Sequence, residues 1–332
     1  MTAVVAGVGQ TRFSRRGTAT AGALAAQAIV AALRDARLGP EAIDGVVRFD
    51  RDALWEYDLP GVLRIRALHF YNALPVGPGS APALLRMAAM AVTQGVATTV
   101  LCYHAREAGR GPSVPVAAAA LIARRHGIDE AAIGRVTLAH RRAAAANPRA
   151  CARRSLDAAG RRRSPYVAEP VRAVDVAEPS AGACAFVVTR ADLARRSAVR
   201  IVGSMQAAIP SATQHLPEWF ARKPLDAIAR AARTMFKAAR LRPDDVDVAC
   251  LTAETSALVP LALRVYGIEH ARVNPHGGQL GEAALDGVND VVEAVRQLRG
   301  DAMRPVRGAR TALAAGSLLE PTSAVLLATS SA

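Results

Sequence analysis

The chain carries the same short sequence pattern twice, once in each half. The pattern Arg-Leu-x-Pro, continued after two further residues by Ile or Val and then Asp, begins at Arg37 and again at Arg240. A glycine-containing, strand-like run that ends in Gln precedes each copy, at 6–10 and at 202–206. Because a supersecondary unit that occurs twice indicates an internal repeat, the sequence predicts two similar α/β halves.

Helical and strand-like segments alternate along both halves, which predicts an α/β fold. Apolar residues three and four apart predict helices, and short apolar or β-branched runs predict strands. The Arg-rich connection at 148–168 shows these patterns least, so we divide the chain into halves at 1–165 and 166–332. The predicted helices span Ala21–Ala36, Ser80–Gln94, Val116–His126, Asp129–Asn147, Leu225–Leu241 and Leu280–Arg299, and the predicted strands span Val4–Val8, Gly45–Phe49, Thr98–Tyr103, Gly182–Thr189, Val199–Gly203, Val246–Thr252, Ala309–Ala315 and Ala324–Thr329.

The chain is strongly basic, with a formal net charge of +14 over 332 residues. Such a charge raises the question of nucleic-acid binding. However, aromatic residues make up only 4% of the chain and are not interleaved with the basic residues, as a base-stacking surface requires. All the basic residues except Lys223 and Lys237 are arginine, which indicates a compositional bias. We therefore expect no nucleic-acid partner. A small anionic ligand is compatible with the positive electrostatic field of the chain.

Other broad classes are disfavoured by the distribution of apolar residues and cysteines. The chain has no run of about 18 uncharged apolar residues, so no membrane span is expected. The N-terminus enters a strand-like run with no basic segment ahead of it, so we expect no signal peptide. The four cysteines show no metal-binding or disulfide spacing, which predicts no metal site and a cytoplasmic protein.

Two motifs in the second half carry a resemblance to a known family. The turn VNPHGGQLGE at 273–282 is followed by EAVRQLRG at 293–300. Together they resemble the thiolase superfamily, in particular the bacterial lipid-transfer-protein branch related to the sterol carrier protein x thiolases. Supporting strings at 5–9, 100–105 and 175–188 extend the resemblance over essentially the whole chain.

The resemblance implies a fold, a ligand class and partners. It implies a duplicated, five-layer αβαβα fold that is usually dimeric, either with itself or with a thiolase-like paralogue. It also implies coenzyme A thioesters as ligands, with no bound cofactor of the protein's own. In this branch it further implies a possible partner subunit with a zinc ribbon and an OB fold.

The catalytic positions of the family are altered in this chain. A thiolase needs a thiolate at the start of a buried helix, where the helix dipole and a nearby His lower its pKa. The resemblance places that position at Pro78, which cannot act as a nucleophile, and Ser80 is expected to be the N-cap of the helix. The branch's His or Tyr position falls at Ala284, the polar strand-end anchor at Ala253, and the second cysteine at Ser317.

The polar residues that remain near these positions are the candidates for catalysis. Glu254 ends a predicted strand, where sites of α/β proteins gather, and His276 lies in the glycine-rich turn. Glu282 and Asp286 could form an acid/base pair or simply stabilise the start of a helix, and His276 could equally be structural. Tyr103 and His104 are expected as supporting residues or dimer contacts, and the expected substrate-binding residues are Gly77, Pro78, Gly79, Ser80, Asn274, Gly277, Gly278 and Ser317.

Two hypotheses about function follow from these substitutions. In the first, the chain is a thiolase-fold subunit without the cysteine nucleophile, and it acts as an accessory member of a complex. In the second, it is an enzyme with cysteine-independent chemistry on a CoA thioester, either a retro-aldol carbon–carbon lyase or an acyltransferase. Backbone amides of 77–80 would then serve as oxyanion donors.

Overall fold

The computed structural model describes residues 2–17, 19–65, 67–77, 79–109, 116–195, 197–208, 225–319 and 321–330. Ten strands within these ranges form one sheet in the order β10-β9-β11-β12-β8-β1-β7-β4-β2-β3. In chain order they are β1 (Ala3–Gln10), β2 (Gly45–Phe49), β3 (Phe70–Leu74), β4 (Thr99–Arg106), β7 (Gly182–Arg190), β8 (Val199–Ala207), β9 (Val248–Leu251), β10 (Arg272–Val273), β11 (Thr311–Ala315) and β12 (Thr322–Ala328).

The strand order repeats itself, which confirms the predicted duplication. The first five strands lie in the order β3-β2-β4-β7-β1, and the second five lie in the equivalent order β10-β9-β11-β12-β8. The two half-sheets join through a short antiparallel pairing of β1 with β8, in which Val4 faces Arg200 and Val5 faces Val199. At the two copies of the sequence pattern, equivalent short 3-10 turns follow α1 and α8, at Pro40–Ala42 and Pro243–Asp245.

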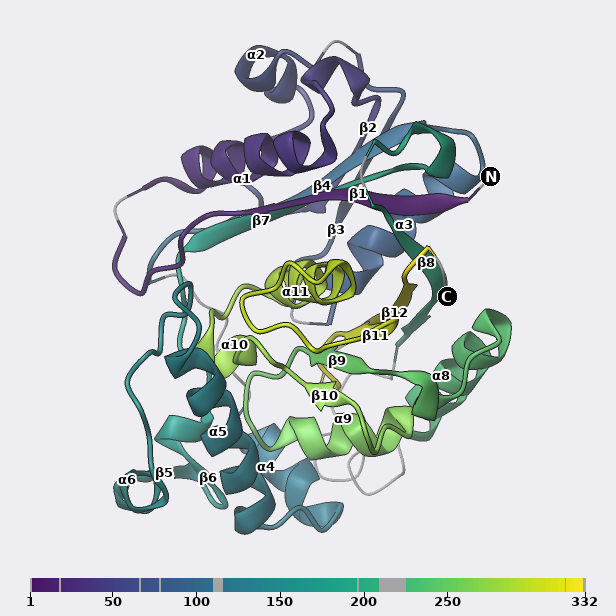
Figure 1. The fold of residues 1–332 in the computed structure, drawn as a ribbon. Helices are drawn as coiled ribbons and strands as arrows, with labels where there is room; N and C mark the ends of the chain where they lie inside the picture. The colour runs from purple at the N-terminus through teal and green to yellow at the C-terminus, as the bar shows by residue number, and fades with distance from the viewer. Residues whose placement is uncertain are drawn as a thin grey trace.

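Helices complete a five-layer arrangement, as the resemblance implies (Figure 1). Helix α1 (Ala21–Ala36) covers the outer face of the first half-sheet, and α8 (Leu225–Ala239) and α9 (Leu258–Tyr266) cover that of the second. Helices α3 (Ala81–Thr93) and α11 (Val288–Arg299) lie between the half-sheets and share one apolar core with both. The middle layer therefore belongs equally to the two halves.

Small residues allow the outer helix α1 to lie directly on the sheet. A Cβ atom added to Gly9 of β1 would overlap the carbonyl oxygen of Ala28 and the backbone nitrogen of Ala32. Gly7 faces the same helix with equally little room. The glycines of β1 and the alanines of α1 thus bring the two backbones into close contact.

A separate group of elements covers the end of the second half-sheet. It comprises α4 (Val116–Arg125), α5 (Glu130–Ala145), α6 (Ala158–Arg163) and the hairpin β5–β6 (Tyr166–Ala168 with Val171–Arg172). The buried carboxylate of Asp175 accepts hydrogen bonds from Arg161 Nε and Nη2, both at 2.8 Å. The Arg-rich connection is therefore organised around an internal ion pair, whereas the sequence suggested little structure there.

Several predicted elements are corrected by the structure. The helix predicted over Leu280–Arg299 is broken into α10 (Gly278–Gly281) and α11, which begins only at Val288. The break occurs because Asp286 and Gly287 adopt left-handed backbone conformations, with φ of 50° and 88°. The strands β3 and β10 and the helices α2 (Leu59–Leu63) and α9 were not anticipated.

The chain passes between the half-sheets later than the division expected at 165/166. Strand β7 follows that division in the sequence, yet it pairs with β1 and β4 of the first half. Strand pairing therefore places the passage from one half-sheet to the other between Arg190 and Val199. In the described part of the chain, no helix has the length and hydropathy that a bilayer span requires.

Candidate functional site

The start of the buried helix α3 is where the family would place its nucleophile. Pro78, which occupies that position, lies outside the described residues. Ser80 stands at the N-cap as expected, but its side chain makes no capping hydrogen bond. Gly79 packs backbone to backbone against Gly316, and Ser323 Oγ donates a hydrogen bond to the Gly79 carbonyl oxygen at 2.7 Å. The loop that contains Ser317 is thereby held against the loop that precedes α3.

None of the four thiols is at the head of α3. Cys102, Cys184 and Cys250 lie within β4, β7 and β9, and burial raises the pKa of each well above its ordinary value. Cys151 follows α5 and is half-buried, and burial raises its pKa also. Each of these groups is a neutral thiol at physiological pH, so a cysteine acyl-enzyme has no support in this site.

Glu254 and Ser317 form a buried polar pair beside these loops. Ser317 Oγ donates a hydrogen bond to Glu254 Oε2 at 2.7 Å, and both residues are more than nine-tenths buried. The strand end that carries Glu254 reaches α3 through Gly287, where an added Cβ would overlap Thr252 Oγ1 and lie 3.2 Å from the Ala81 Cβ. A carboxylate and a hydroxyl therefore occupy the strand ends around the start of the buried helix.

The glycine-rich turn at 274–278 is built by backbone conformations that few residues adopt. Asn274, Gly277 and Gly278 have φ of 42°, 110° and 60°. The Asn274 side chain bonds to the backbone of Leu251 as a neighbouring strand would. Its Oδ1 accepts a hydrogen bond from the Leu251 amide, and its Nδ2 donates one to the Leu251 carbonyl oxygen. These three predicted binding residues thus shape the turn and fix it to β9.

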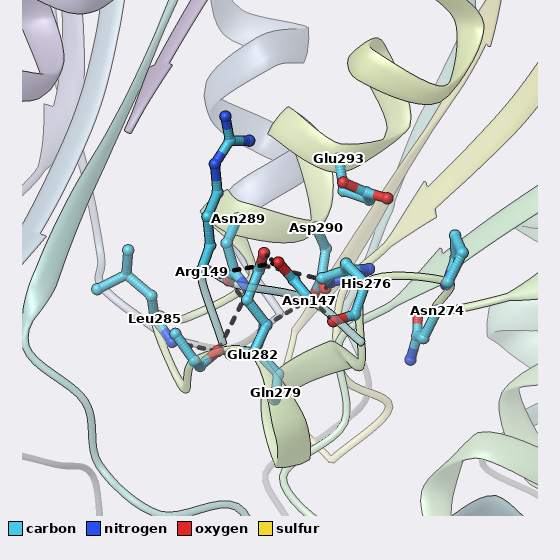
Figure 2. Close-up of polar contacts among 12 residues, drawn as sticks. Asn147, Arg149, Asn274, His276, Gln279, Glu282, Leu285, Asn289, Asp290 and Glu293 are labelled. Carbon is cyan, nitrogen blue, oxygen red and sulfur yellow. Dashed lines mark hydrogen bonds and ion pairs between the residues drawn. The ribbon is translucent and has the colours of Figure 1, made fainter. Parts of the chain in front are cut away.

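His276 projects from this turn into a fully buried polar network (Figure 2). Its Nε2 lies 2.8 Å from Asp290 Oδ1 and 3.9 Å from Glu282 Oε2. Glu282 in turn accepts hydrogen bonds from Asn147 Nδ2 at 3.0 Å and from Asn289 Nδ2 at 3.1 Å. The turn, the segment 282–287, α11 and the end of α5 are therefore connected through one set of hydrogen bonds.

The charges in this network are set by burial and by mutual pairing. Burial lowers the pKa of His276, but Glu282, Asp290 and Glu293 together raise it to about 9. Burial raises the pKa of Glu282, and the imidazolium of His276 opposes that shift. The carboxylates beside Nε2 thus favour the protonated form of His276.

Asp286 points into a different cluster from Glu282. Its Oδ2 lies 3.0 Å from His104 Nε2 and accepts a hydrogen bond from Arg106 Nη1 at 3.1 Å. The two predicted acid/base partners are therefore not a pair on one helix face, since the segment 282–287 turns their side chains to different neighbours. Ala284, between them, is half-buried, and its amide donates to Ser180 Oγ at 3.3 Å.

Sequence reasoning missed most of the residues that support these candidates. Asp290 also accepts hydrogen bonds from Thr252 and Gln279, and Gln279 Oε1 accepts from the Leu285 amide. The sequence carries only part of the signal: polar residues lie among the apolar ones of α11, but the burial that makes them informative is seen in the fold. The missed residues are Asp52, Arg106, Asn147, Gln279, Asn289 and Asp290.

Comparisons with known proteins agree with this geometry. No protein-family model matches the chain. A 17-hydroxy-3-oxo-4-pregnene-20-carboxyl-CoA lyase of Mycobacterium tuberculosis is 32% identical, with 98% of each chain covered. That alignment spans 383 positions, more than the 332 residues here, so the relative carries insertions that this chain lacks.

Solved structures give the same picture. An Ltp2–ChsH2(DUF35) aldolase superposes with a TM-score of 0.90 at 28% identity, covering 99% of this chain and 98% of that one. A monomeric SCP2-thiolase-like protein type 1 from Mycobacterium smegmatis superposes with a TM-score of 0.79 at 21% identity, covering 100% of this chain and 78% of that one.

The duplicated layers and the glycine-rich turn define a protein of the thiolase class. Within that class, the chain belongs to the lipid-transfer-protein branch of the thiolase superfamily. The predicted resemblance and the predicted fold class are thus confirmed. The dimer stays a prediction, as do the roles assigned to individual site residues.

Proposed function

We propose that the chain is a lyase that cleaves a β-hydroxyacyl-CoA thioester by a retro-aldol reaction. The observation that carries the proposal is the full-length similarity to a lyase whose name specifies a CoA thioester with a hydroxyl group on the β-carbon. The absence of a thiol from the head of α3 supports the same conclusion, since a retro-aldol reaction needs no covalent acyl-enzyme. The second of the two hypotheses is therefore favoured over the accessory role.

The reaction needs one base and one stabilised enolate. The base removes the proton of the β-hydroxyl group, the bond between the α- and β-carbons breaks, and the β-carbon leaves as a carbonyl compound. The electron pair passes to the thioester enolate, which then takes a proton at its α-carbon.

We assign the base to Glu254. Its carboxylate follows the end of β9 and accepts a hydrogen bond from the hydroxyl of Ser317, which lies in the loop held against Gly79. The same carboxyl group, once protonated, can return the proton to the enolate carbon. His276 is a poorer candidate, because its proton is held by Asp290 and Glu282.

The enolate oxygen would be stabilised by the start of α3. The positive end of a helix dipole favours a developing negative charge. Gly79 and Gly316 leave no room for a side chain at this point, so that the two loops approach closely. The network around His276 would hold the glycine-rich turn beside this position, without contacting the reacting atoms.

A partner subunit is part of the proposal. The structural relative is named as a complex of Ltp2 with ChsH2(DUF35). We propose that a subunit with a zinc ribbon and an OB fold, as the family resemblance implies, joins this chain and completes the binding of the CoA portion.

The proposal is tested with the purified chain, alone and with a co-expressed DUF35 partner. The substrate is a β-hydroxyacyl-CoA with a tertiary hydroxyl group, and mass spectrometry measures the ketone and the shortened acyl-CoA. We expect cleavage by the complex and a loss of at least 100-fold in kcat for Glu254→Gln. Glu269→Gln, at an exposed carboxylate, is the matched control. Full activity of Glu254→Gln would refute the assignment of the base. A wild-type complex without lyase activity would refute the proposed function and favour the accessory role instead.

A further inference from the structure

A second buried network lies beside the site, and the proposed reaction does not use it directly. His104 on β4 stands between two carboxylates, with Nδ1 2.8 Å from Asp52 Oδ1 and Nε2 3.0 Å from Asp286 Oδ2. His104, Asp52 and Asp286 are all more than nine-tenths buried, and the rings of His104 and Phe49 form a T-shaped contact with their centroids 4.9 Å apart. Both ring nitrogens of His104 are therefore already occupied by carboxylates, and neither is free to act on a substrate.

One side of the network is rigid. Asp52 Oδ1 accepts a further hydrogen bond from the amide of Ala105, and Asp52 Oδ2 accepts one from the amide of Phe49. These bonds tie the carboxylate to the ends of the paired strands β2 and β4. The imidazole of His104 is thereby oriented by the sheet of the first half.

The other side of the network ends on the segment 282–287. Asp286 has a φ of 50°, a conformation that is unfavourable for a residue with a side chain, so surrounding contacts must maintain it. His104 and Arg106 supply those contacts through Asp286 Oδ2. With His104 protonated, the two cations balance the two carboxylates, and the buried network is neutral.

The same segment bears on the proposed reaction. Glu282 at its start binds the network of His276, and Gly287 at its end fits between Thr252 and Ala81 at the start of α3. A shift of Asp286 would therefore move both the glycine-rich turn and the wall of the site.

We propose that His104 is a positioning residue, which holds the segment 282–287 of the second half in its active geometry from the sheet of the first half. This inference rests on the proposed function for its effect on turnover, while its structural part stands independently. His104 acts through Asp286 and makes no contact with the substrate. Its loss should lower kcat and leave KM nearly unchanged.

Two substitutions separate the two contacts of His104. From the lengths of the side chains, we expect the amide of His104→Asn to reach Asp52 but not Asp286, and the amide of His104→Gln to reach Asp286. We expect hydrogen exchange in peptides covering 282–288 to rise at least tenfold in His104→Asn, with peptides of α1 unchanged. We expect a smaller rise in His104→Gln, which keeps a hydrogen-bond donor to Asp286 but lacks the charge of the imidazolium. His270→Asn, at an exposed histidine, is the control.

Turnover is measured on the same variants. We expect kcat of His104→Asn to fall about tenfold, KM to change by less than twofold, and His104→Gln to recover most of kcat. Unchanged exchange at 282–288, exchange that rises equally throughout the chain, or changed exchange with unchanged kcat would each overturn the proposal. If the wild-type complex lacks lyase activity, the proposed function fails while the exchange result still decides the structural part. If His104→Asn does not fold, Arg106→Gln tests the same anchor on Asp286.

Discussion

The buried network of His104 predicts a loss of stability at alkaline pH. Burial alone would lower the pKa of His104, but the charges of Asp52 and Asp286 and the hydrogen bonds to them raise it from 6.5 to about 9. A group that binds its proton more tightly in the folded state stabilises that state. Its contribution is complete below pH 6.5 and is lost as the pH rises through 9.

The size of the effect follows from the pKa shift. One pKa unit corresponds to about 1.4 kcal/mol, so the shift of His104 corresponds to about 3 kcal/mol of folding free energy. Burial in the folded state also raises the pKa of the cysteines, which changes stability over the same pH range. A comparison of wild type with His104→Gln removes these common contributions, because they are present in both proteins.

The assay is urea unfolding followed by circular dichroism at pH 6.5 and at pH 9.5. We expect wild type to lose about 3 kcal/mol more than His104→Gln between these two values. Histidine NMR provides an independent measurement, in which the resonance assigned to His104 should titrate near pH 9. Parallel pH profiles for the two proteins, or titration of His104 near 6.5, would show that the carboxylates do not hold its proton.

Three further predictions concern packing, ion pairing and thiol reactivity. Gly9→Ala should destabilise the chain by about 3 kcal/mol in urea unfolding, because the added methyl group meets only backbone atoms of α1; an unchanged midpoint would contradict the close packing of that helix. Arg161→Met should cost roughly 3 to 5 kcal/mol, because it leaves the buried carboxylate of Asp175 without its counter-charge, and Arg161→Met combined with Asp175→Leu should recover much of that loss; equal destabilisation by the single and double variants would count against the pair. A disulfide reagent should modify Cys151 first among the four thiols of the folded chain, and Cys151→Ser should abolish that reaction; rapid modification that persists in the variant would show that a strand cysteine is accessible.

Much of the fold could be predicted because the relevant signals are local and occur twice. The pattern that begins at Arg37 and Arg240 ends a helix, forms a short turn and opens a strand in both halves. Each step depends on a few neighbouring residues, so the sequence specifies it directly. Helix α9 was not anticipated, although its Pro260 lies in the first turn, where proline is tolerated.

The candidate site could be predicted only in part, because its geometry depends on residues far apart in the sequence. Glu282 and Asp286 have the spacing of one helix face, and nothing local shows that the chain turns between them. The left-handed conformation of Asp286 is stabilised by His104 and Arg106, which come from the other half of the chain. The pairing of Glu254 with Ser317 likewise requires β9 to lie beside the loop after β11.

The shared middle layer has a consequence for how such a chain can arise. Helices α3 and α11 each bury apolar side chains against both half-sheets, so one half made alone would expose a broad apolar surface to water. A single ancestral copy would have needed a second molecule of itself to cover that surface. Fusion of two such genes would have replaced the association of two molecules by packing within one chain. The two copies could then have diverged in sequence.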